Sequence, residues 1–346
     1  MKSSPRGDDS ANRALSLGAL SVRYLLLFMV VLGAASFLPD IDPRTVWSQA
    51  TAGGEEFVFW HELRFRRLVY ASAVGALLGL AGALFQAVLR NPLAEPYILG
   101  ISGAAALGAL LVRVIAPVGV AAGIGWITFG PLVGALLGTG LLLSLARWGG
   151  WYDPPSLILA GAVLNAIFGA LILLVYSLAP EGKVVSSLFW LMGNIHAQAI
   201  VGTPALPATL LALAIGGGIF TAFARPLDLL SLGDEEAQDL GLSPGRVRLI
   251  VLVGASLLTG VVVGFAGPIG FIGLVVPHIM RRLHGPMHRR LLPLSMFGGA
   301  LFLVIADTLA RCALDRPLPI GVVTALVGGP FFLFLLGSYR RREGLA

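Results

Sequence analysis

A cluster of carboxylates in the longest polar segment is the feature of this sequence best suited to recognising a partner. The segment 225–248 holds four acidic residues close together: Asp234, Glu235, Glu236 and Asp239. Serine and glycine are both favoured at the start of a helix, so Ser231 or Gly233 can cap a short helix here. The acidic residues would then occupy its first turn, where they interact favourably with the positive end of the helix dipole. Gly241 can end this helix. Anionic lipid headgroups repel an acidic helix, so the sequence favours docking to a soluble protein over binding along a membrane surface.

Three arginines, Arg64, Arg66 and Arg67, directly precede a long apolar run. Guanidinium groups pair carboxylates through two parallel hydrogen bonds, so these residues are suited to binding an acidic partner. Arginines at the end of a membrane helix also anchor it to lipid headgroups. The residues alone leave both interpretations open.

A single carboxylate, Asp307, lies inside a later apolar run. A lone charge at the middle of a bilayer costs at least about 2.5 kcal/mol. Arg311 follows one helical turn later, so the two side chains can pair on one face. The sequence favours a structural ion pair over a proton relay, which would require further buried carboxylates.

Residues for catalysis, metal binding or cofactor binding are not assembled in this sequence. His278 and His284 are six residues apart and do not share a helical face, and a Gly-Pro pair separates both from His288, so no familiar metal-ligand spacing is present. The phosphate-binding run G-x-x-x-x-G-K-[ST] is also absent, since Gly182-Lys183 lacks the earlier glycine. We predict no catalytic, metal or cofactor-binding residues, and we expect ATP and Mg²⁺ to be bound by a separate partner subunit.

The composition requires an apolar solvent. The chain is 57% hydrophobic and 12% charged, with a mean hydropathy of +0.88, whereas soluble domains carry roughly 25% charged residues. Its apolar runs do not alternate as barrel strands do, and helices satisfy their own backbone groups in lipid. The sequence therefore predicts an all-α polytopic membrane protein.

Runs near 20 apolar residues are long enough to cross a bilayer as helices. We expect about ten transmembrane helices, at 22–38, 68–88, 99–115, 121–146, 157–178, 204–224, 248–266, 268–283, 291–312 and 320–337. The seventh and eighth runs are separated only by Gly267 and Pro268. The pairs Gly75/Gly79 and Gly134/Gly138 have the small-xxx-small spacing that lets helices approach closely.

An even number of spans places both termini on one side. With the termini inside, twice as many lysines and arginines lie inside as outside, as the positive-inside rule requires. This bias explains the net charge of +6 without nucleic-acid binding. We expect a cytoplasmic tail at 1–20, one transmembrane permease domain at 21–338 containing the inner loop 226–247, and a second cytoplasmic tail at 339–346.

The turn between the second and third spans, Arg90 to Pro96, contains two prolines that exclude a regular helix. It is either a plain connector or a constriction where a transport path meets the cytoplasm.

Six stretches together resemble the permease subunits of type II ABC importers, the FecCD-type family for iron–siderophores, haem and vitamin B12. They are LRFRRLVYASAVGALLGLAGALFQAVLRNPLAEPYILGISGAA (63–105), LILAGAVLN (157–165), SLGDEEAQDLGLSPGRVR (231–248), GFAGPIGFIGLVVPHIMRRL (264–283), ADTLARCAL (306–314) and PIGVVTALVGGPFFLFLL (319–336). The resemblance implies ten helices with both termini inside, a homodimer, two cytoplasmic ATPase subunits and a periplasmic or lipid-anchored binding protein. It places the chain in a bacterial inner membrane.

The resemblance also implies roles for particular residues. Arg64, Arg67 and Arg311 would dock the binding protein, and Asn91 and Leu93 would form the cytoplasmic gate. The segment that couples to the ATPase would contain Leu232, Gly233, Asp234, Glu235, Glu236, Asp239, Leu240 and Gly241.

The sequence departs from the family pattern where Arg66 replaces a usual proline and Arg316 a usual acidic residue, which adds positive charge outside. The expected cargo is a metal chelate, with ferric siderophore favoured and haem or cobalamin as alternatives. An ion-coupled secondary transporter and an intramembrane enzyme are alternatives from other classes, and both would need more buried acidic residues.

Overall fold

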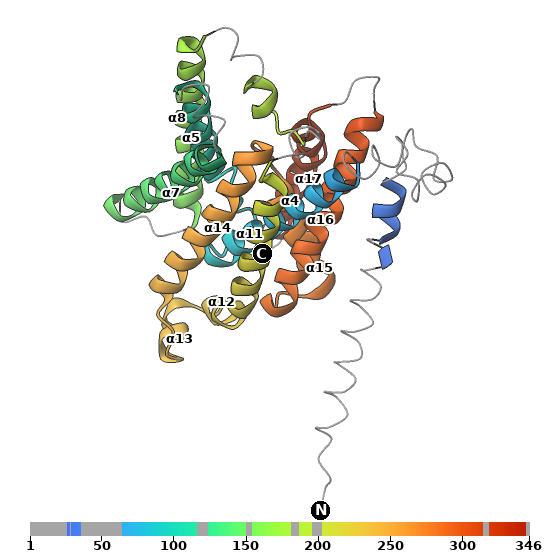
Figure 1. Cartoon of the computed structure of the whole chain (residues 1–346). Coiled ribbons are helices and arrows are strands. Elements are labelled where there is room, and N and C mark those ends of the chain that lie inside the picture. Colours follow the sequence, from blue (N-terminus) through green and yellow to red (C-terminus); the bar gives the residue numbers. More distant parts are fainter. Residues whose placement is uncertain are drawn as a thin grey trace, which may run out of the picture.

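A computed structural model describes residues 26–27, 29–35, 64–115, 124–149, 154–180, 187–195, 203–313 and 318–343. Its regular structure in these ranges is helical, as the sequence predicts (Figure 1). The helices are α4 (Arg66–Val88), α5 (Ile101–Ile115), α7 (Ile124–Gly149), α8 (Pro154–Leu178), α11 (Ala205–Ala222), α12 (Ala224–Leu230), α13 (Asp234–Asp239), α14 (Pro244–Ala266), α15 (Ile272–His284), α16 (His288–Cys312) and α17 (Ile320–Glu343).

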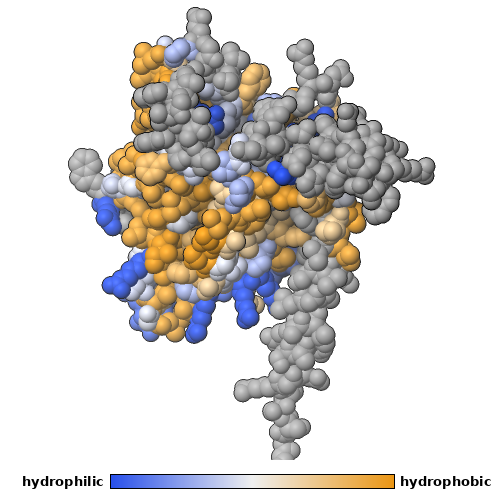
Figure 2. Space-filling model, in the orientation of Figure 1, coloured by the Kyte–Doolittle hydropathy of each residue, from blue (hydrophilic) through white to orange (hydrophobic). Residues whose placement is uncertain are grey.

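Each predicted span from the second onward corresponds to one of these helices. Six of the described helices are long and apolar enough to cross a membrane, and α5 and α17 contain shorter apolar stretches. The first predicted span, 22–38, is described only in part, and the predicted tail 1–20 lies outside the described residues. The coloured surface in Figure 2 has an apolar band, and hydrophilic residues gather at the end of the bundle that carries α12 and α13.

One predicted boundary is corrected by the structure, and two segments are more helical than their names suggest. The eighth span was predicted from residue 268, but α15 begins at Ile272, because Gly267 and Phe271 have φ of 75° and 71° and interrupt the helix around Pro268. Helix α17 continues to Glu343, into the predicted tail at 339–346. The inner loop 226–247 is itself largely helical, since it contains α13, most of α12 and the start of α14.

Helix α4 is the centre of the bundle. In its membrane window 89% of the residues are buried, against 22% in α8, and it packs against α16, α14, α15 and α11. This packing requires glycine, because a Cβ atom on Gly75 would lie 2.2 Å from the carbonyl oxygen of Gly299. The predicted close approach at Gly75 and Gly79 is confirmed, and α16 is the partner helix.

The second glycine pair brings α7 against α5. A Cβ atom on Gly134 would lie 2.3 Å from the carbonyl oxygen of Ala104, and one on Gly138 would lie 2.5 Å from the Cβ atom of Ala104. Helix α8 packs on the same pair, and the three helices form the green group at one side of the bundle in Figure 1. Much of α8 is therefore left exposed, including Leu159, Leu173 and Leu178 at 69%, 67% and 78%.

Candidate coupling and gating site

The short acidic helix predicted from the sequence is α13. Gly233, with φ of 149°, is its N-cap residue, and Asp234, Glu235 and Glu236 occupy its first turn, where they suit the helix dipole. Gly241 follows the helix with φ of 81°. Gly233 is therefore the capping residue of α13, while Ser231 ends the preceding helix α12 instead.

The first carboxylate of α13 is engaged within the chain. Both amino groups of Arg248 donate to Asp234, from Nη1 to Oδ2 at 2.6 Å and from Nη2 to Oδ1 at 2.7 Å. Nη2 of Arg90 also pairs with Oδ1. These partners hold the pKa of Asp234 below its ordinary value of 3.8, chiefly through the hydrogen bonds from Arg248. The ionised carboxylate thus fastens α13 to α14 and to the turn after α4.

Arg90 connects the predicted coupling segment to the predicted gate. It has a left-handed backbone with φ of 46°, and its Nε donates to the carbonyl oxygen of Leu230 at 2.8 Å. The backbone N–H of Leu93 donates to Oδ1 of Asn91 at 2.8 Å, which closes the turn that follows Arg90. Asn91 and Leu93, the predicted gate residues, therefore directly follow a side chain that is bound to α12 and α13.

Sequence reasoning missed Arg90 and Arg248 as site residues. Each stands at the border of a segment that the sequence analysis singled out, but nothing in the local sequence pairs residues 144 positions apart. The available signal was a basic residue at the border of each of these two segments, and the positive-inside bias already accounted for both arginines.

A buried carboxyl group lies at the end of the gate turn. Glu95 is 2% exposed, and burial raises its pKa to about 8, although a hydrogen bond from the backbone of Phe271 acts in the opposite direction. Nε2 of Gln86 donates to the carbonyl oxygen of Gly273 at 3.1 Å, and Nη1 of Arg281 donates to Oε1 of Gln86 at 3.0 Å. The turn is thus anchored through Glu95 to the start of α15, and the last turns of α4 are anchored through Gln86 to both ends of α15.

At the other end of α4, two arginines share one buried carboxylate. Asp307 is fully buried, and its Oδ1 accepts from Nη2 of Arg67 at 2.7 Å while its Oδ2 accepts from Nε of Arg311 at 3.2 Å. The predicted Asp307–Arg311 pair is confirmed, and Arg67 was not foreseen as its third member. The two arginine side chains are only 15% and 9% exposed, and Arg64 is partly buried. Binding-protein docking by these three arginines stays a prediction.

The histidines do not come together as a site. Nδ1 of His288 lies 2.7 Å from Oδ1 of Asp228, which also accepts from the His288 backbone N–H, so this pair joins α12 to the first turn of α16. His278 instead stacks edge-on against Phe331. No group of three His, Cys, Asp or Glu residues suited to a metal ion is found among the described residues.

The apolar bundle, with a polar end that carries α12 and α13, is the fold of a polytopic membrane protein. The model of the FecCD transport family matches residues 25–338, and the chain belongs to this family. It is thus a permease subunit of an ABC importer of the iron–siderophore, haem and vitamin B12 class, as the resemblance implied.

The names of individual relatives state different transported substrates. The chain is 40% identical to the Fe(3+) dicitrate transport system permease protein FecD of Escherichia coli, covering 86% of this chain and 91% of that one. It is 38% identical to the cobalamin import system permease protein BtuC of Halobacterium salinarum, with coverage of 79% and 72%. It is 36% identical to the hemin transport system permease protein HmuU of Yersinia pestis, with coverage of 94% and 96%.

The fold also matches a solved structure described as an inward-facing conformation of a metal-chelate type ABC transporter. The TM-score is 0.78 at 27% identity, over 93% of this chain and 99% of that one.

The link between α13 and the gate turn can be tested with one substitution. Asp234→Asn should raise hydrogen–deuterium exchange in 231–241 and in 89–95 together, because both segments lose the same charge-assisted bonds. We expect about fivefold faster exchange, since partly exposed ion pairs contribute up to about 1 kcal/mol. Glu235→Gln, in the same helical turn, is the matched control and should change neither segment. Unchanged exchange in 89–95 would show that Arg90 does not transmit the state of α13.

Proposed function

We propose that this chain forms a homodimer that imports a ferric chelate across a bacterial inner membrane by alternating access. Two cytoplasmic ATPase subunits would bind at the α13 end, and a periplasmic or lipid-anchored binding protein would dock at the opposite end. Both termini would lie in the cytoplasm. The observation that carries this proposal is the surface of α13, within a chain of the FecCD family.

Helix α13 presents a mixed apolar and acidic surface. Leu232 and Leu240, which flank it, are 60% and 59% exposed, and Glu235, Glu236 and Asp239 are exposed carboxylates. Exposed leucines outside an apolar span favour burial against a protein, and the carboxylates suit a basic rim around that contact. The expected coupling residues thus divide into a surface for the ATPase and Asp234, which faces its own chain.

This division supplies a mechanism for coupling. Movement of α13 by a closing ATPase would act through Asp234 on Arg90 and on Arg248. Arg90 leads directly into the gate residues Asn91 and Leu93, and Arg248 lies in the first turns of α14. The gate turn and a membrane helix would therefore move with α13 as a rigid body, while the ATPase binds the ATP and Mg²⁺.

At the outer end, Asp307 would hold the docking arginines in place. It occupies Nε and Nη2 of Arg67, which leaves Nη1 of that guanidinium for a partner's carboxylate. Since Arg311 shares the same acid, the group carries a net positive charge that suits an acidic lobe of the binding protein.

The cargo is proposed as a ferric siderophore. The relatives named for Fe(3+) dicitrate, cobalamin and hemin are 40%, 38% and 36% identical, so identity does not separate these cargoes. A cavity of about 440 Å³ beside α17, lined by apolar side chains that include Leu191, Phe271 and Val322, suits a chelate that must be released intact. Haem and cobalamin are the alternative cargoes.

The alternatives from other classes are not favoured. An ion-coupled transporter and an intramembrane enzyme both need titratable groups in the membrane helices. Among the described membrane-spanning helices, Asp307 is the fully buried carboxylate, and two arginines already hold it.

The ATPase surface is tested by charge reversal on α13. Glu235→Lys combined with Glu236→Lys should weaken co-purification of the ATPase by at least about tenfold, because like charges placed across an interface cost several kcal/mol. ATP hydrolysis coupled to transport should fall in parallel. The matched control, Glu235→Asp with Glu236→Asp, keeps the charge and should keep the association. Normal association of the lysine variant would remove α13 as the docking surface.

Docking of the binding protein is tested by a double-mutant cycle. Arg67→Gln and Asp307→Asn should each weaken docking, and the double variant should be no weaker than Arg67→Gln, because coupled residues are not additive. The effect of salt on docking should also shrink in Arg67→Gln, because this variant removes a positive charge from the docking group. ATPase association reports whether each variant is folded. Docking that is unaffected in a folded Arg67→Gln variant would contradict the proposed role.

The cargo is tested on the cognate binding protein. Metal analysis of the purified protein should find iron, and its absorbance should lack the bands of haem and of a corrin. Haem bands would identify the cargo as haem, and corrin bands would identify it as cobalamin; either result would contradict the ferric siderophore.

A further inference from the structure

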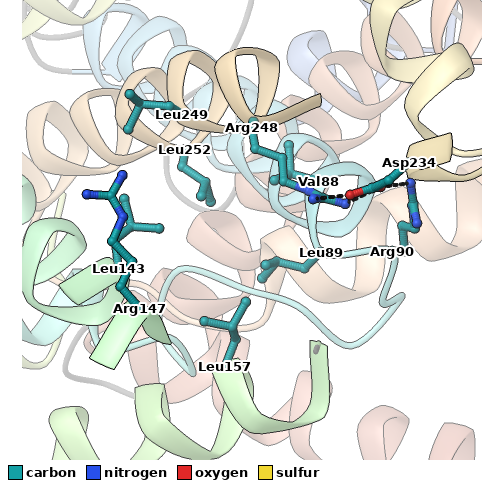
Figure 3. Close-up of a pocket in the computed structure, with 11 residues that line it drawn as sticks. Val88, Leu89, Arg90, Leu143, Arg147, Leu157, Asp234, Arg248, Leu249 and Leu252 are labelled. Carbon is teal, nitrogen blue, oxygen red and sulfur yellow. Dashed lines mark hydrogen bonds and ion pairs between the residues drawn. The ribbon is translucent and has the colours of Figure 1, made fainter. Parts of the chain in front are cut away.

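A second cavity lies at the α13 end of the bundle, between the inner ends of α4, α7, α8 and α14 (Figure 3). Its volume is about 440 Å³, within the range of roughly 300–1,000 Å³ that small-molecule sites occupy. Asp234 of α13 closes one side. The cavity is separate from the apolar cavity beside α17 that we propose for the cargo, since the two share no lining residue.

The walls of this cavity carry an excess of positive charge. Three arginines, Arg90, Arg147 and Arg248, line it together with one acid, Asp234, so the charge of the lining is 3 − 1 = +2. Asp234 is shared between Arg90 and Arg248. Arg147 has no hydrogen-bond or ion-pair partner within the described parts of the chain. The lining therefore attracts an anion, and Arg147 offers it an unused guanidinium fork.

The remaining wall is apolar. Leu143, Leu157, Leu249 and Leu252 line it, and Figure 3 shows Leu252 between Arg147 and the Arg90–Asp234–Arg248 group. Leu249 is 47% exposed, whereas Leu252 is buried, so the apolar wall runs from the surface into the cavity. A small inorganic anion gains nothing from such a wall, but a hydrocarbon chain does.

We propose that this cavity binds a phosphate-bearing amphiphile, of the kind that an anionic phospholipid of the inner leaflet presents. The phosphate pairs with Arg147, because arginine matches phosphate oxygens through parallel hydrogen bonds. The first part of an acyl chain lies along the leucines. The surplus charge of Arg90 and Arg248 attracts the headgroup, as basic residues at this leaflet do.

Occupancy of this cavity bears on coupling. Its two paired arginines are the same groups that fasten α13 to α14 and to the gate turn. A bound phosphate places a second anion beside Arg90 and Arg248, in addition to Asp234. The lipid composition of the inner leaflet therefore alters how strongly these arginines bind Asp234.

The experiment measures phospholipid retained by the full chain. The protein is equilibrated with vesicles of phosphatidylcholine mixed with phosphatidylglycerol, delipidated to a fixed extent, and analysed by native mass spectrometry. We expect Arg147→Gln to lower retained phosphatidylglycerol by about fivefold, since one basic residue near an anionic surface contributes about that factor. Retained phosphatidylcholine should not change.

Two further variants make the result specific. Arg246→Gln removes an exposed arginine of the same helix end as Arg248 that does not line the cavity, and it should retain phosphatidylglycerol like the unaltered chain. Leu249→Phe narrows the cavity while keeping all three arginines, and it should lose phosphatidylglycerol. If lipid were attracted only by positive charge in general, Arg246→Gln and Arg147→Gln would lose the same amount of phosphatidylglycerol, and that result would overturn the proposal.

A second arm distinguishes a lipid from a free phosphate. Inorganic phosphate is added to the detergent-purified chain, and thermal unfolding is measured. Stabilisation that requires Arg147 but not Leu249 would support the anion site with free phosphate as its source, whereas loss of phosphatidylglycerol in both variants supports a lipid. Equal phosphatidylglycerol retention by Arg147→Gln and the unaltered chain, with no Arg147-dependent effect of phosphate, would overturn the proposal. This assay needs no ATPase or cargo, so its outcome is independent of the proposed import function.

Discussion

The bidentate contact between Arg248 and Asp234, extended by Arg90, is the interaction on which the inner end of this molecule depends. A six-residue helix has too few internal hydrogen bonds to be stable alone. Helix α13 is held because its own Ala237 is buried and its Asp234 is bound to two neighbouring elements. The same contact leaves the other carboxylates of α13 facing outward.

Helix α4 connects this inner contact to the outer arginine group. It carries Arg67 near its outer end, and Arg90 follows its inner end. Between them its residues are almost entirely buried against four helices. Gly75 and Gly79 allow the backbone of α16 to lie directly against it. A helix packed this closely moves as a unit with its neighbours, so the two ends of the permease are joined by one stiff element.

Much of the architecture could be predicted because each membrane helix depends on one contiguous run of apolar residues. Length and hydropathy determine each span in lipid, and this is why the spans from 68–88 onward correspond to helices. The errors fall where backbone geometry overrides composition. The run beginning at Pro268 is apolar enough to continue a helix, but the left-handed Phe271 delays α15 to Ile272. In the polar loop 226–247, the structure adds most of α12 and the start of α14 to the short helix that the sequence predicts.

The sequence by itself determined the membrane-helical class, the short acidic helix with its glycine boundaries, the Asp307–Arg311 pair and the family motifs. Each depends on residues within about one helical turn, or on a run of apolar residues, so proximity in the chain is sufficient. Only the tertiary structure decided that Asp234 faces Arg90 and Arg248, that Arg67 joins Asp307, and that Arg147 lines a cavity. These contacts join residues from separate elements, and which faces of two helices meet is set by close packing across the whole bundle.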